Sequence, residues 1–465
     1  MQKIVLLIDF GSTYTKLTLV DPSAMEVLRT AQIPTSSQEG LQLCYTEGKK
    51  ALLQSLKFSD QVEIIEEYFC SSAWGGFKMI AIGLTESLTL EAAKRAALGA
   101  GSRILQTFCY RLTLDQLEEI EQRKPDVVLL TGGCNGGNQE IIRHNARLLA
   151  QLSTEIALIV AGNEDSYGEL SKLLQDRNNT YFTENVMPDV NKLNPIPVRK
   201  IAQKVFLEKI VHSKGIHQVA AHASAPIIPT PKAVLAAAKL LKEGTQTSKG
   251  FGNLVVVDIG GATTDIHSVG DGLPQAENVY FEGLEEPYLK RTVEGDLGMR
   301  SSAVSLLRCI VEDSNRIRAL SSWKFTTLQA ACYYRCSHPT YVPKTREECL
   351  IDQFLAQSAT AIALERHAGK IRKEYTPNRT IYYQHGKDLR NFQTIIGTGG
   401  VIIHSQSPKK IVKPDIKGMS NTLLPVDPRI LIDQDYLLSA MGLLSQNYPE
   451  AALNILKKKL YRLNP

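Results

Sequence analysis

Apolar runs that end in tight turns are the first pattern in the sequence. Residues 3–9 form an apolar run that ends in an Asp-Phe-Gly turn, and residues 14–20 then alternate between apolar and polar side chains. A continuous apolar run predicts a buried strand, and alternation predicts a returning strand with one exposed face. Residues 27–33 predict a third strand. The pattern recurs in the second half of the chain, where the run 254–259 leads into a similar Asp-Ile-Gly turn at residues 258–260.

The rhythm changes after residue 76, where short apolar runs alternate with segments of helical periodicity. Such alternation predicts a parallel, doubly wound sheet with helices on both faces. Periodicity leaves open whether this sheet belongs to the first half of the fold or is an inserted α/β domain. We expect strands at 77–83, 103–108, 126–131 and 156–160, and helices near 87–99, 113–122, 138–150 and 165–176.

The remaining sequence predicts a helical bridge and then a second mixed region. Residues 185–249 are mainly helical in pattern and are punctuated by prolines. Further helices are expected near 297–312, 345–368 and 437–447, with a strand at 394–396. The fold class is therefore α/β. We expect four regions: 1–76 as the first part of an N-terminal half, 77–184 as the doubly wound segment, 185–249 as the bridge and 250–465 as a C-terminal half.

Composition and charge narrow the function classes. The 465 residues are 43% hydrophobic and 22% charged, which is enough to build sizeable cores. The net charge of +5, from 53 basic and 48 acidic residues, is too small to indicate a nucleic-acid partner. No apolar run approaches the roughly 18 residues of a membrane span, and no signal peptide is expected. The eight cysteines form no disulfide-like framework, so a reducing cytoplasm is the expected compartment.

The two turns repeat one polar motif. They read Asp9-Phe10-Gly11-Ser12-Thr13-Tyr14-Thr15-Lys16 and Asp258-Ile259-Gly260-Gly261-Ala262-Thr263-Thr264-Asp265. The two segments match at the aspartate, at the first glycine and at the threonine before the last position. Two such units far apart in the chain indicate a duplicated half rather than a tandem array.

The chemistry of these turns suits a nucleoside triphosphate. A strand–glycine–strand turn presents backbone N–H groups, and glycine lets that backbone approach a phosphate closely. Asp9 and Asp258 are expected to hold a hydrated Mg²⁺, which prefers one or two carboxylates together with water and phosphate oxygens. Asp258 is also a candidate to orient the attacking water. Hydroxyl donors and a point charge come from Ser12, Thr13, Thr263, Thr264 and Lys16, although Lys16 lies on a strand from which it can point elsewhere.

A third segment, Gly397-Thr398-Gly399-Gly400, follows the strand expected at 394–396. Its bare backbone would let an adenosine lie against it. The alternative is a tight strand-to-helix turn. Together the three segments predict a site for ATP and Mg²⁺ with Asp258, Asp9 and Thr263 as catalytic residues. The residues expected to bind the nucleotide are Gly11, Ser12, Thr13, Lys16, Gly260, Gly261, Ala262, Thr264, Asp265, Gly397, Thr398, Gly399 and Gly400.

This three-part set resembles the superfamily of acetate and sugar kinases, DnaK-type chaperones and actin. The resemblance implies an actin-like ATPase fold, in which two ribonuclease-H-like halves lie around a nucleotide cleft, with additional α/β and helical material in the middle. It identifies the first turn as phosphate-1, the second as phosphate-2 and the third segment as the adenosine motif. Asp9 matches the phosphate-1 aspartate. Asp258, Thr263 and Asp265 match the opening aspartate, the hydroxyl position and the closing aspartate of phosphate-2.

The chain as a whole resembles the MutL/GlmL family, accessory proteins associated with glutamate mutase and similar adenosylcobalamin-dependent mutases. This family shares only a name with the mismatch-repair protein. The resemblance implies an ATP-driven reactivase or chaperone whose partner is such a mutase; release of damaged cobalamin is an analogy with diol dehydratase reactivases. The resembling segments are VLLIDFGSTYTKLTLVD, FKMIAIGLTESLTLEAAKRAALGAG, DVVLLTGGCNGGN, LVVVDIGGATTDIHSV, RTVEGDLGMR and IIGTGGV.

Three rival functions stay open at this point. A small-molecule kinase of the same superfamily would need a general-base carboxylate in a substrate pocket, and the sequence does not identify one. An iron–sulfur ATPase that activates 2-hydroxyacyl-CoA dehydratases would need cluster-ligating cysteines. A nucleotide-gated, non-catalytic scaffold would bind ATP without turnover.

Four further features have a structural and a functional interpretation. The turn Thr131-Gly132-Gly133-Cys134-Asn135-Gly136-Gly137-Asn138 is expected to be a tight strand-to-helix turn, with anion binding as the alternative. The motif Cys332-x-x-x-Cys336-x-His338 lacks the second half of a zinc site. His267 is expected to be a strand residue rather than a catalytic base. Residues 294–298 are expected to cap the helix near 297–312, with a position near the nucleotide as the alternative.

Overall fold

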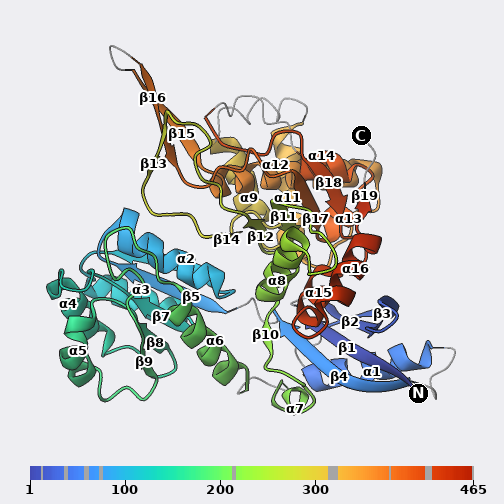
Figure 1. Ribbon diagram of the computed structural model, residues 1–465, viewed down its shortest axis with the longest axis horizontal. Coiled ribbons are helices and arrows are strands. Elements are labelled where there is room, and N and C mark those ends of the chain that lie inside the picture. The colour runs from blue at the N-terminus through green and yellow to red at the C-terminus, as the bar shows by residue number, and fades with distance from the viewer. Residues whose placement is uncertain are drawn as a thin grey trace. The chain divides into compact units, whose positions relative to one another are not determined.

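The computed structural model describes residues 1–11, 14–35, 40–56, 62–72, 77–211, 216–312, 323–375, 379–413 and 421–462 (Figure 1). The chain divides into two compact units. The first comprises Met1–Val234 and Gly283–Pro287, and the second comprises Leu235–Glu282 and Tyr288–Pro465. No helix in these described ranges combines the length and the apolar character that crossing a membrane requires.

The first unit contains a five-stranded sheet built around the N-terminal turn, in the order β10-β4-β1-β2-β3. Strands β1, β2 and β3 form an antiparallel meander, β4 is parallel to β1, and β10 is parallel to β4. The strands predicted at 3–9, 14–20 and 27–33 are thereby confirmed. The bounds are β1 (Gln2–Phe10), β2 (Tyr14–Asp21), β3 (Glu26–Pro34), β4 (Val62–Ser71) and β10 (Ile228–Pro229).

Three elements of this first layer were not predicted, namely β4, α1 and the two-residue strand β10. Strand β4 carries three glutamates within its apolar residues, which hides the run, and only its last five positions are buried. Helix α1 (Leu41–Gln54) packs against β2 and β3. Its buried residues Leu41, Tyr45 and Leu52 belong to the same core as Leu17 and Phe69 of the sheet.

The second unit repeats this arrangement in a six-stranded sheet of order β14-β12-β11-β17-β18-β19. Strands β11, β12 and β14 form an antiparallel meander, and β17 and β18 follow in parallel on the other side of β11. The first five strands of each half thus have the order 3-2-1-4-5 with only the second strand reversed, so the predicted pair of ribonuclease-H-like halves is confirmed. In the second half, β19 is added to the edge antiparallel to β18. The bounds are β11 (Leu254–Ile259), β12 (Thr264–Val269), β14 (Leu289–Glu294), β17 (Thr394–Thr398), β18 (Arg429–Ile432) and β19 (Tyr461–Arg462).

A third sheet, entirely parallel, has the order β6-β5-β7-β8-β9. Numbered along the chain this order is 2-1-3-4-5, that of flavodoxin-like doubly wound sheets. It lies between β4 and β10 in sequence, so it is inserted between the fourth and fifth strands of the first half. The four predicted strands are present, and β9 was not predicted. The bounds are β5 (Lys78–Gly83), β6 (Arg103–Cys109), β7 (Val127–Leu130), β8 (Ala157–Val160) and β9 (Thr180–Phe182).

Helices cover both faces of this parallel sheet, which explains its continuous apolar strands. One core joins alternate residues of β5 to α2 and α6, and the other joins the remaining residues to α3, α4 and α5. These helices agree with the predicted alternation. Their bounds are α2 (Glu91–Gly99), α3 (Leu114–Arg123), α4 (Glu140–Leu149), α5 (Tyr167–Leu173) and α6 (Ile196–Val211), with short helical turns η3 (Glu86–Leu90) and η4 (Glu164–Ser166).

The predicted bridge contains α6, α7 (Ile216–Ala220) and α8 (Thr230–Glu243), so its helical character is confirmed. A small sheet of order β13-β16-β15 in the second unit was not predicted. Its strands are β13 (Val279–Glu282), β15 (Lys370–Tyr375) and β16 (Thr380–His385). The remaining helices are α9 (Ala303–Glu312), α11 (Phe325–Ser337), α12 (Arg346–His367), α13 (Gly400–Ile403), α14 (Pro408–Val412), α15 (Leu438–Leu444) and α16 (Pro449–Lys459).

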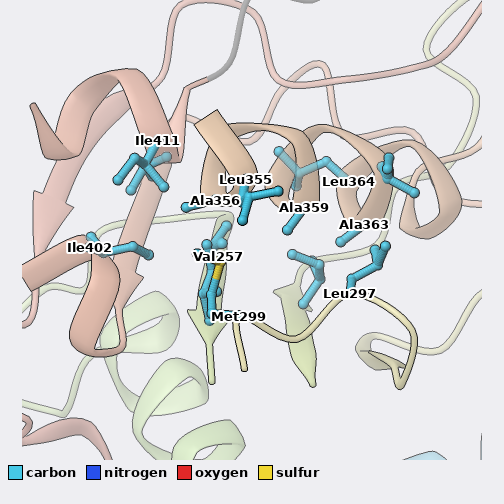
Figure 2. Close-up of a cluster of buried hydrophobic side chains, with 14 of the residues drawn as sticks. Val257, Leu297, Met299, Leu355, Ala356, Ala359, Ala363, Leu364, Ile402 and Ile411 are labelled. Carbon is cyan, nitrogen blue, oxygen red and sulfur yellow. The ribbon is translucent and has the colours of Figure 1, made fainter. Parts of the chain in front are cut away.

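The core of the second unit lies beneath α12. This helix begins at a capping box, in which Thr345 and Glu348 each accept a hydrogen bond from the other's backbone. Small and branched apolar side chains along one face of α12 gather near Val257 of β11 (Figure 2). Leu297 and Met299, which follow β14, enter the same core and are almost completely buried.

Candidate functional site

Strand register makes the two predicted turns structurally equivalent. Asp9 lies opposite Lys16 across β1 and β2, and Asp258 lies opposite Asp265 across β11 and β12. Both turns therefore contain the same number of residues, and the two aspartates occupy the same position in each half. The matching of the two motifs in the sequence is reproduced by their strand pairing.

The first glycine of each turn closes it in the same way. The N–H of Gly11 donates to the carbonyl of Tyr14 (3.1 Å), and the N–H of Gly260 donates to the carbonyl of Thr263 (2.9 Å). A Cβ atom on Gly11 would lie 2.4 Å from the carbonyl oxygen of Tyr14, so that position requires glycine. The same backbone hydrogen bond thus closes the turn in both halves.

The phosphate-2 turn, residues 260–263, is held from one side by residues 295–302. Three consecutive carbonyl oxygens of the turn accept hydrogen bonds from this segment. The pairs are Met299 N to Gly260 O (3.1 Å), Arg300 N to Gly261 O (2.7 Å) and Ser302 Oγ to Ala262 O (2.8 Å). Because Leu297 and Met299 are buried in the core beneath α12 (Figure 2), the supporting segment has a fixed position.

Gly298 brings this segment into direct backbone contact with the turn. A Cβ atom there would lie 2.3 Å from the carbonyl carbon of Ala262, a distance that only glycine avoids. The expectation that residues 294–298 cap a helix starting near 297 is wrong, because α9 begins at Ala303 and the preceding residues pack on the turn. Helical periodicity extended too far toward the N-terminus because Leu297 and Met299 are apolar for a different reason.

The N–H groups of the same turn remain available. Gly261, Ala262 and Thr263 donate no backbone hydrogen bond to any residue in the described part of the chain. Gly261 is exposed, and Ala262 and Thr263 are half-buried. Successive N–H groups on a turn whose carbonyl groups are already bonded elsewhere form a concavity that attracts anions. This turn therefore has the geometry of a phosphate-binding loop.

The polar side chains of the turn bond mostly to the protein itself. Thr263 Oγ1 donates to Asp265 Oδ2 (3.0 Å), and Asp265 also forms a buried ion pair with Arg291 of β14 (2.7 Å). Thr264 Oγ1 donates to the carbonyl of Leu297 (2.8 Å). Thr264 and Asp265, both predicted to bind the nucleotide, thus hold the turn in place in this structure.

His267 lies within β12 and is 1% exposed, as expected of a strand residue. Burial, and then the positive charge of Arg291, lower the pKa of His267 to about 3. The imidazole is therefore neutral over the physiological pH range. It takes no part in the exposed face of the turn.

Asp258 is half-buried at the end of β11, next to Thr398 of β17. The segment 397–400 passes close to this strand end. Gly399 has a positive φ of 101°, and a Cβ atom on it would lie 2.3 Å from the carbonyl oxygen of Ile259. The structure thus brings the third predicted segment beside the phosphate-2 aspartate. Helix α13 begins at Gly400, so the segment is also a strand-to-helix turn.

Asp433 is a buried residue of this edge that the sequence analysis did not identify. Its carboxylate accepts hydrogen bonds from Thr398 Oγ1 (3.2 Å) and from the N–H groups of Leu437 (2.7 Å) and Leu438 (3.1 Å). The hydroxyl of Thr398 is therefore used to hold the strand end. A signal was present, since Asp433 follows the apolar residues of β18 just as Asp9 and Asp258 lie near the ends of their strands.

In the first half, the phosphate-1 aspartate has a different environment. Asp9 is 5% exposed, and its Oδ1 accepts a hydrogen bond from Thr230 Oγ1 (2.6 Å) at the start of α8. Thr230 was also not identified from the sequence. Lys16 lies directly across the strand pair from Asp9. Ser12 and Thr13, predicted to contact phosphate, lie outside the described residues.

In the inserted sheet, the glycine-rich turn at 131–138 donates hydrogen bonds to carboxylates of the protein itself. The N–H of Gly136 donates to Asp165 Oδ2 (2.7 Å), and Asn135 Nδ2 donates to Glu164 Oε1 (3.2 Å). Asn185 Nδ2 donates to the carbonyl of Gly133 (2.9 Å). These contacts fit the tight strand-to-helix turn that was expected there.

The cysteines considered for a metal site have separate contacts. Cys336 Sγ lies 3.2 Å from the carbonyl oxygen of Arg300, while His338 stacks on Tyr334. Within the described ranges, no group of three or more histidine, cysteine or acidic residues is arranged to hold a metal ion.

Comparison with known proteins identifies the family of the chain over almost its full length. A family model described as MutL protein matches residues 5–460. The chain belongs to the MutL family. Protein MutL of Clostridium tetanomorphum is 45% identical over 461 residues, which cover 98% of this chain and 99% of that protein. The MutL relationship therefore includes both halves and the inserted sheet.

Solved structures are much more distant from this MutL-family chain. An activator of the 2-hydroxyisocaproyl-CoA dehydratase from Clostridium difficile, with bound ADPNP, has 10% identity and a TM-score of 0.31, with 99% of this chain and 100% of that chain covered. A xylulose kinase from Lactobacillus acidophilus has 12% identity and a TM-score of 0.35, with coverage of 99% and 93%. At these values the likeness carries no argument about function.

Proposed function

We propose that the chain binds ATP with Mg²⁺ at the phosphate-2 turn and hydrolyses it. The observation that supports this most strongly is the turn 260–263, whose carbonyl oxygens are bonded to residues 299–302 while the N–H groups of 261–263 are available. A triphosphate would satisfy these N–H groups on the exposed side. Positioned donors and a metal ion supply most of the catalysis in phosphoryl transfer.

Asp258 is the residue best suited to hold the metal. Its carboxylate is half-buried at the strand end beside the turn, and Mg²⁺ prefers carboxylates together with water and phosphate oxygens. The ion would offset the charge of the phosphates. Asp258 would then orient the water that attacks the terminal phosphate. A contribution from Asp9 and its turn to the same complex stays a prediction of the sequence.

In this proposal, the energy of ATP hydrolysis is used to change the state of a protein partner. Membership of the MutL family supports an accessory role, and the sequence resemblance described above supports an adenosylcobalamin-dependent mutase such as glutamate mutase as the partner. ATP turnover would drive reactivation of the mutase after its cobalamin is damaged.

The test is ATP-dependent recovery of glutamate mutase that has been inactivated with hydroxocobalamin. Wild type and Asp258→Ala are compared, each with ATP and with a non-hydrolysable ATP analogue, and ATP binding is measured by calorimetry. We expect recovery only with wild type and ATP. Asp258→Ala should fold, because Asp258 lies near the end of β11 and its side chain is not fully buried.

The other outcomes separate the rival functions. ATP binding without turnover or recovery would support a nucleotide-gated scaffold. ATP consumption that appears only with added sugars or carboxylic acids would support a small-molecule kinase. Failure to bind ATP at all would overturn the proposal.

A further inference from the structure

Arg300 connects the phosphate-2 turn to a buried acidic residue behind it. Its N–H donates to the carbonyl of Gly261 (2.7 Å), and its Nη2 donates to Asp352 Oδ2 (2.9 Å) on α12. The Nε group donates to the carbonyl of Tyr341 (3.0 Å). The stem of Arg300 lies 3.6 Å from the place that a Cβ atom on Gly261 would occupy. The side chain therefore lies directly behind the turn.

Asp352 holds a second guanidinium group as well. Arg335 of α11 donates from Nε to Asp352 Oδ1 (2.7 Å), and its remaining N–H groups donate to the carbonyls of Ala331 and Glu348 (both 3.2 Å). The side chains of Arg300, Arg335 and Asp352 are 13%, 2% and 6% exposed. One carboxylate is thus shared by two buried cations.

This cluster carries one positive charge more than it carries negative charge. Burying an uncompensated charge is unfavourable unless a counter-charge is near. The ion pair of Asp265 with Arg291, in the same unit, is balanced by comparison. Beyond the Arg300 stem, the exposed side of the turn presents the available N–H groups of residues 261–263. An anion bound by these N–H groups would be attracted by the excess charge behind the turn.

We propose that Arg300, supported by Asp352 and Arg335, is a positioning residue of the phosphate site. Its backbone N–H holds the carbonyl of Gly261 on the buried side, so that the N–H groups face the ligand. The excess positive charge of the cluster favours the β- and γ-phosphates over the nucleoside. This inference rests on the proposed nucleotide function and identifies what gives the turn its preference for phosphate.

The test is the affinity of the full chain for ATP and for adenosine, measured by calorimetry with wild type, Arg300→Met and Arg300→Lys. We expect Arg300→Met to weaken ATP binding about ten-fold at low salt, because one charge near the phosphates is lost. Adenosine affinity should change less than two-fold, because adenosine has no phosphate. Arg300→Lys should recover part of the ATP affinity, since it restores the charge without the guanidinium geometry.

A second variant separates charge from folding. Arg335→Gln leaves Arg300 paired with Asp352, so the turn stays held while the excess charge is lost; we expect weaker ATP binding and an unchanged adenosine affinity. The matched control is Arg372→Met, which removes an exposed charge from β15 of the same unit. Its ATP affinity should equal that of wild type.

The outcomes distinguish this inference from the proposed function. If wild type does not bind ATP, the nucleotide function itself fails. If wild type binds ATP and both Arg300→Met and Arg335→Gln keep the wild-type ratio of ATP to adenosine affinity, only the role of Arg300 is overturned. A loss of melting temperature with that ratio unchanged would show that the cluster is merely structural.

Discussion

The two halves share strand order and register, yet the equivalent aspartates Asp9 and Asp258 have different environments. Asp9 is almost fully buried and is held by the neutral hydroxyl of Thr230, whereas Asp258 is half-buried at the end of its strand. Across the strand pair, Asp9 lies opposite Lys16, whereas Asp258 lies opposite Asp265. The residue opposite the aspartate is thus positively charged in the first half and negatively charged in the second half.

The difference is explained by the contacts that support the turn in the second half. In the second half, Asp265 is paired with Arg291 behind the turn, and residues 299–302 hold the turn's carbonyl groups. That support leaves the N–H groups on the exposed side of the turn available for hydrogen bonds. We therefore expect the second half to carry hydrolysis and the first half to contribute less to it.

The largest effect should come from breaking the buried pair of the second half. In Asp265→Ala, Arg291 would lose the carboxylate that pairs with its buried charge, and removal of one partner from such a pair costs about 3–5 kcal/mol. Urea denaturation, with hydrogen exchange of β11 and β12 as the local readout, measures this loss. Lys16→Ala, the equivalent change in the first half, should cost less.

A double variant tests the reason for that loss. Asp265→Ala combined with Arg291→Ala removes both charges, so it should be more stable than Asp265→Ala alone. If the double variant were as unstable as the sum of its single changes, the ion pair would not explain the effect.

The next largest effect concerns the two aspartates themselves. Asp258→Asn should lower the rate of ATP hydrolysis about 100-fold, the size of effect that follows loss of a positioned electrostatic group. Asp9→Asn should lower it less. Steady-state ATPase assays at saturating ATP and Mg²⁺ measure both. Equal losses would show that the two halves contribute equally to catalysis.

Much of this comparison could be predicted from the sequence because both turns follow strands that are buried on their two faces. Residues 3–9 and 254–259 are continuous apolar runs, and a polar turn after such a run is easily recognised. The inserted parallel sheet was predicted for the same reason. Strand β4 was missed because glutamates interrupt it, and β15 was missed because it is mostly exposed. Strands β13 and β16 are short and mostly only partly buried, so they form no continuous apolar run.

The supporting residues of the site could not be predicted in this way. Thr230 contacts Asp9 across a sequence separation of 221 residues, and Asp352 contacts Arg300 across 52. No local period or motif connects such residues, because only the folded chain brings them together. Residues 297–302 were assigned to a helix, since the apolar spacing of Leu297 and Met299 fits a helix as well as it fits two residues buried in a core.

A smaller effect is expected at the contact that is specific to the second turn. Gly298→Ala would force a methyl group to 2.3 Å from the backbone of Ala262, and such overpacking costs about 1–3 kcal/mol. The shift of the turn should also weaken ATP binding. Thermal denaturation and calorimetry measure the two effects. Gly168→Ala is the matched control, because no atom lies within 4 Å of its added methyl group.

The smallest expected effect is on the pH dependence of stability, which should differ between the two halves. His267 occupies the position in β12 that Thr18 occupies in β2, and burial followed by the charge of Arg291 lowers the pKa of His267 to about 3. The unfolded histidine binds a proton near pH 6.5, so the second unit should lose stability as the pH falls below that value. The slope contributed by His267 is at most about 1.4 kcal/mol per pH unit.

His267→Thr copies the first half and removes this titration. The stability of the second unit is measured between pH 7 and pH 4 by urea denaturation, with hydrogen exchange of β12 as the local readout. As the pH falls, the stability of the variant should then decrease less steeply than that of wild type. The slope would not vanish, because burial also lowers the pKa of His367 in the same core. The variant's stability at pH 7 is a separate matter, since a smaller side chain leaves a cavity there. An unchanged slope would mean that His267 binds its proton equally well in the folded and the unfolded chain, which contradicts the burial that distinguishes the second half.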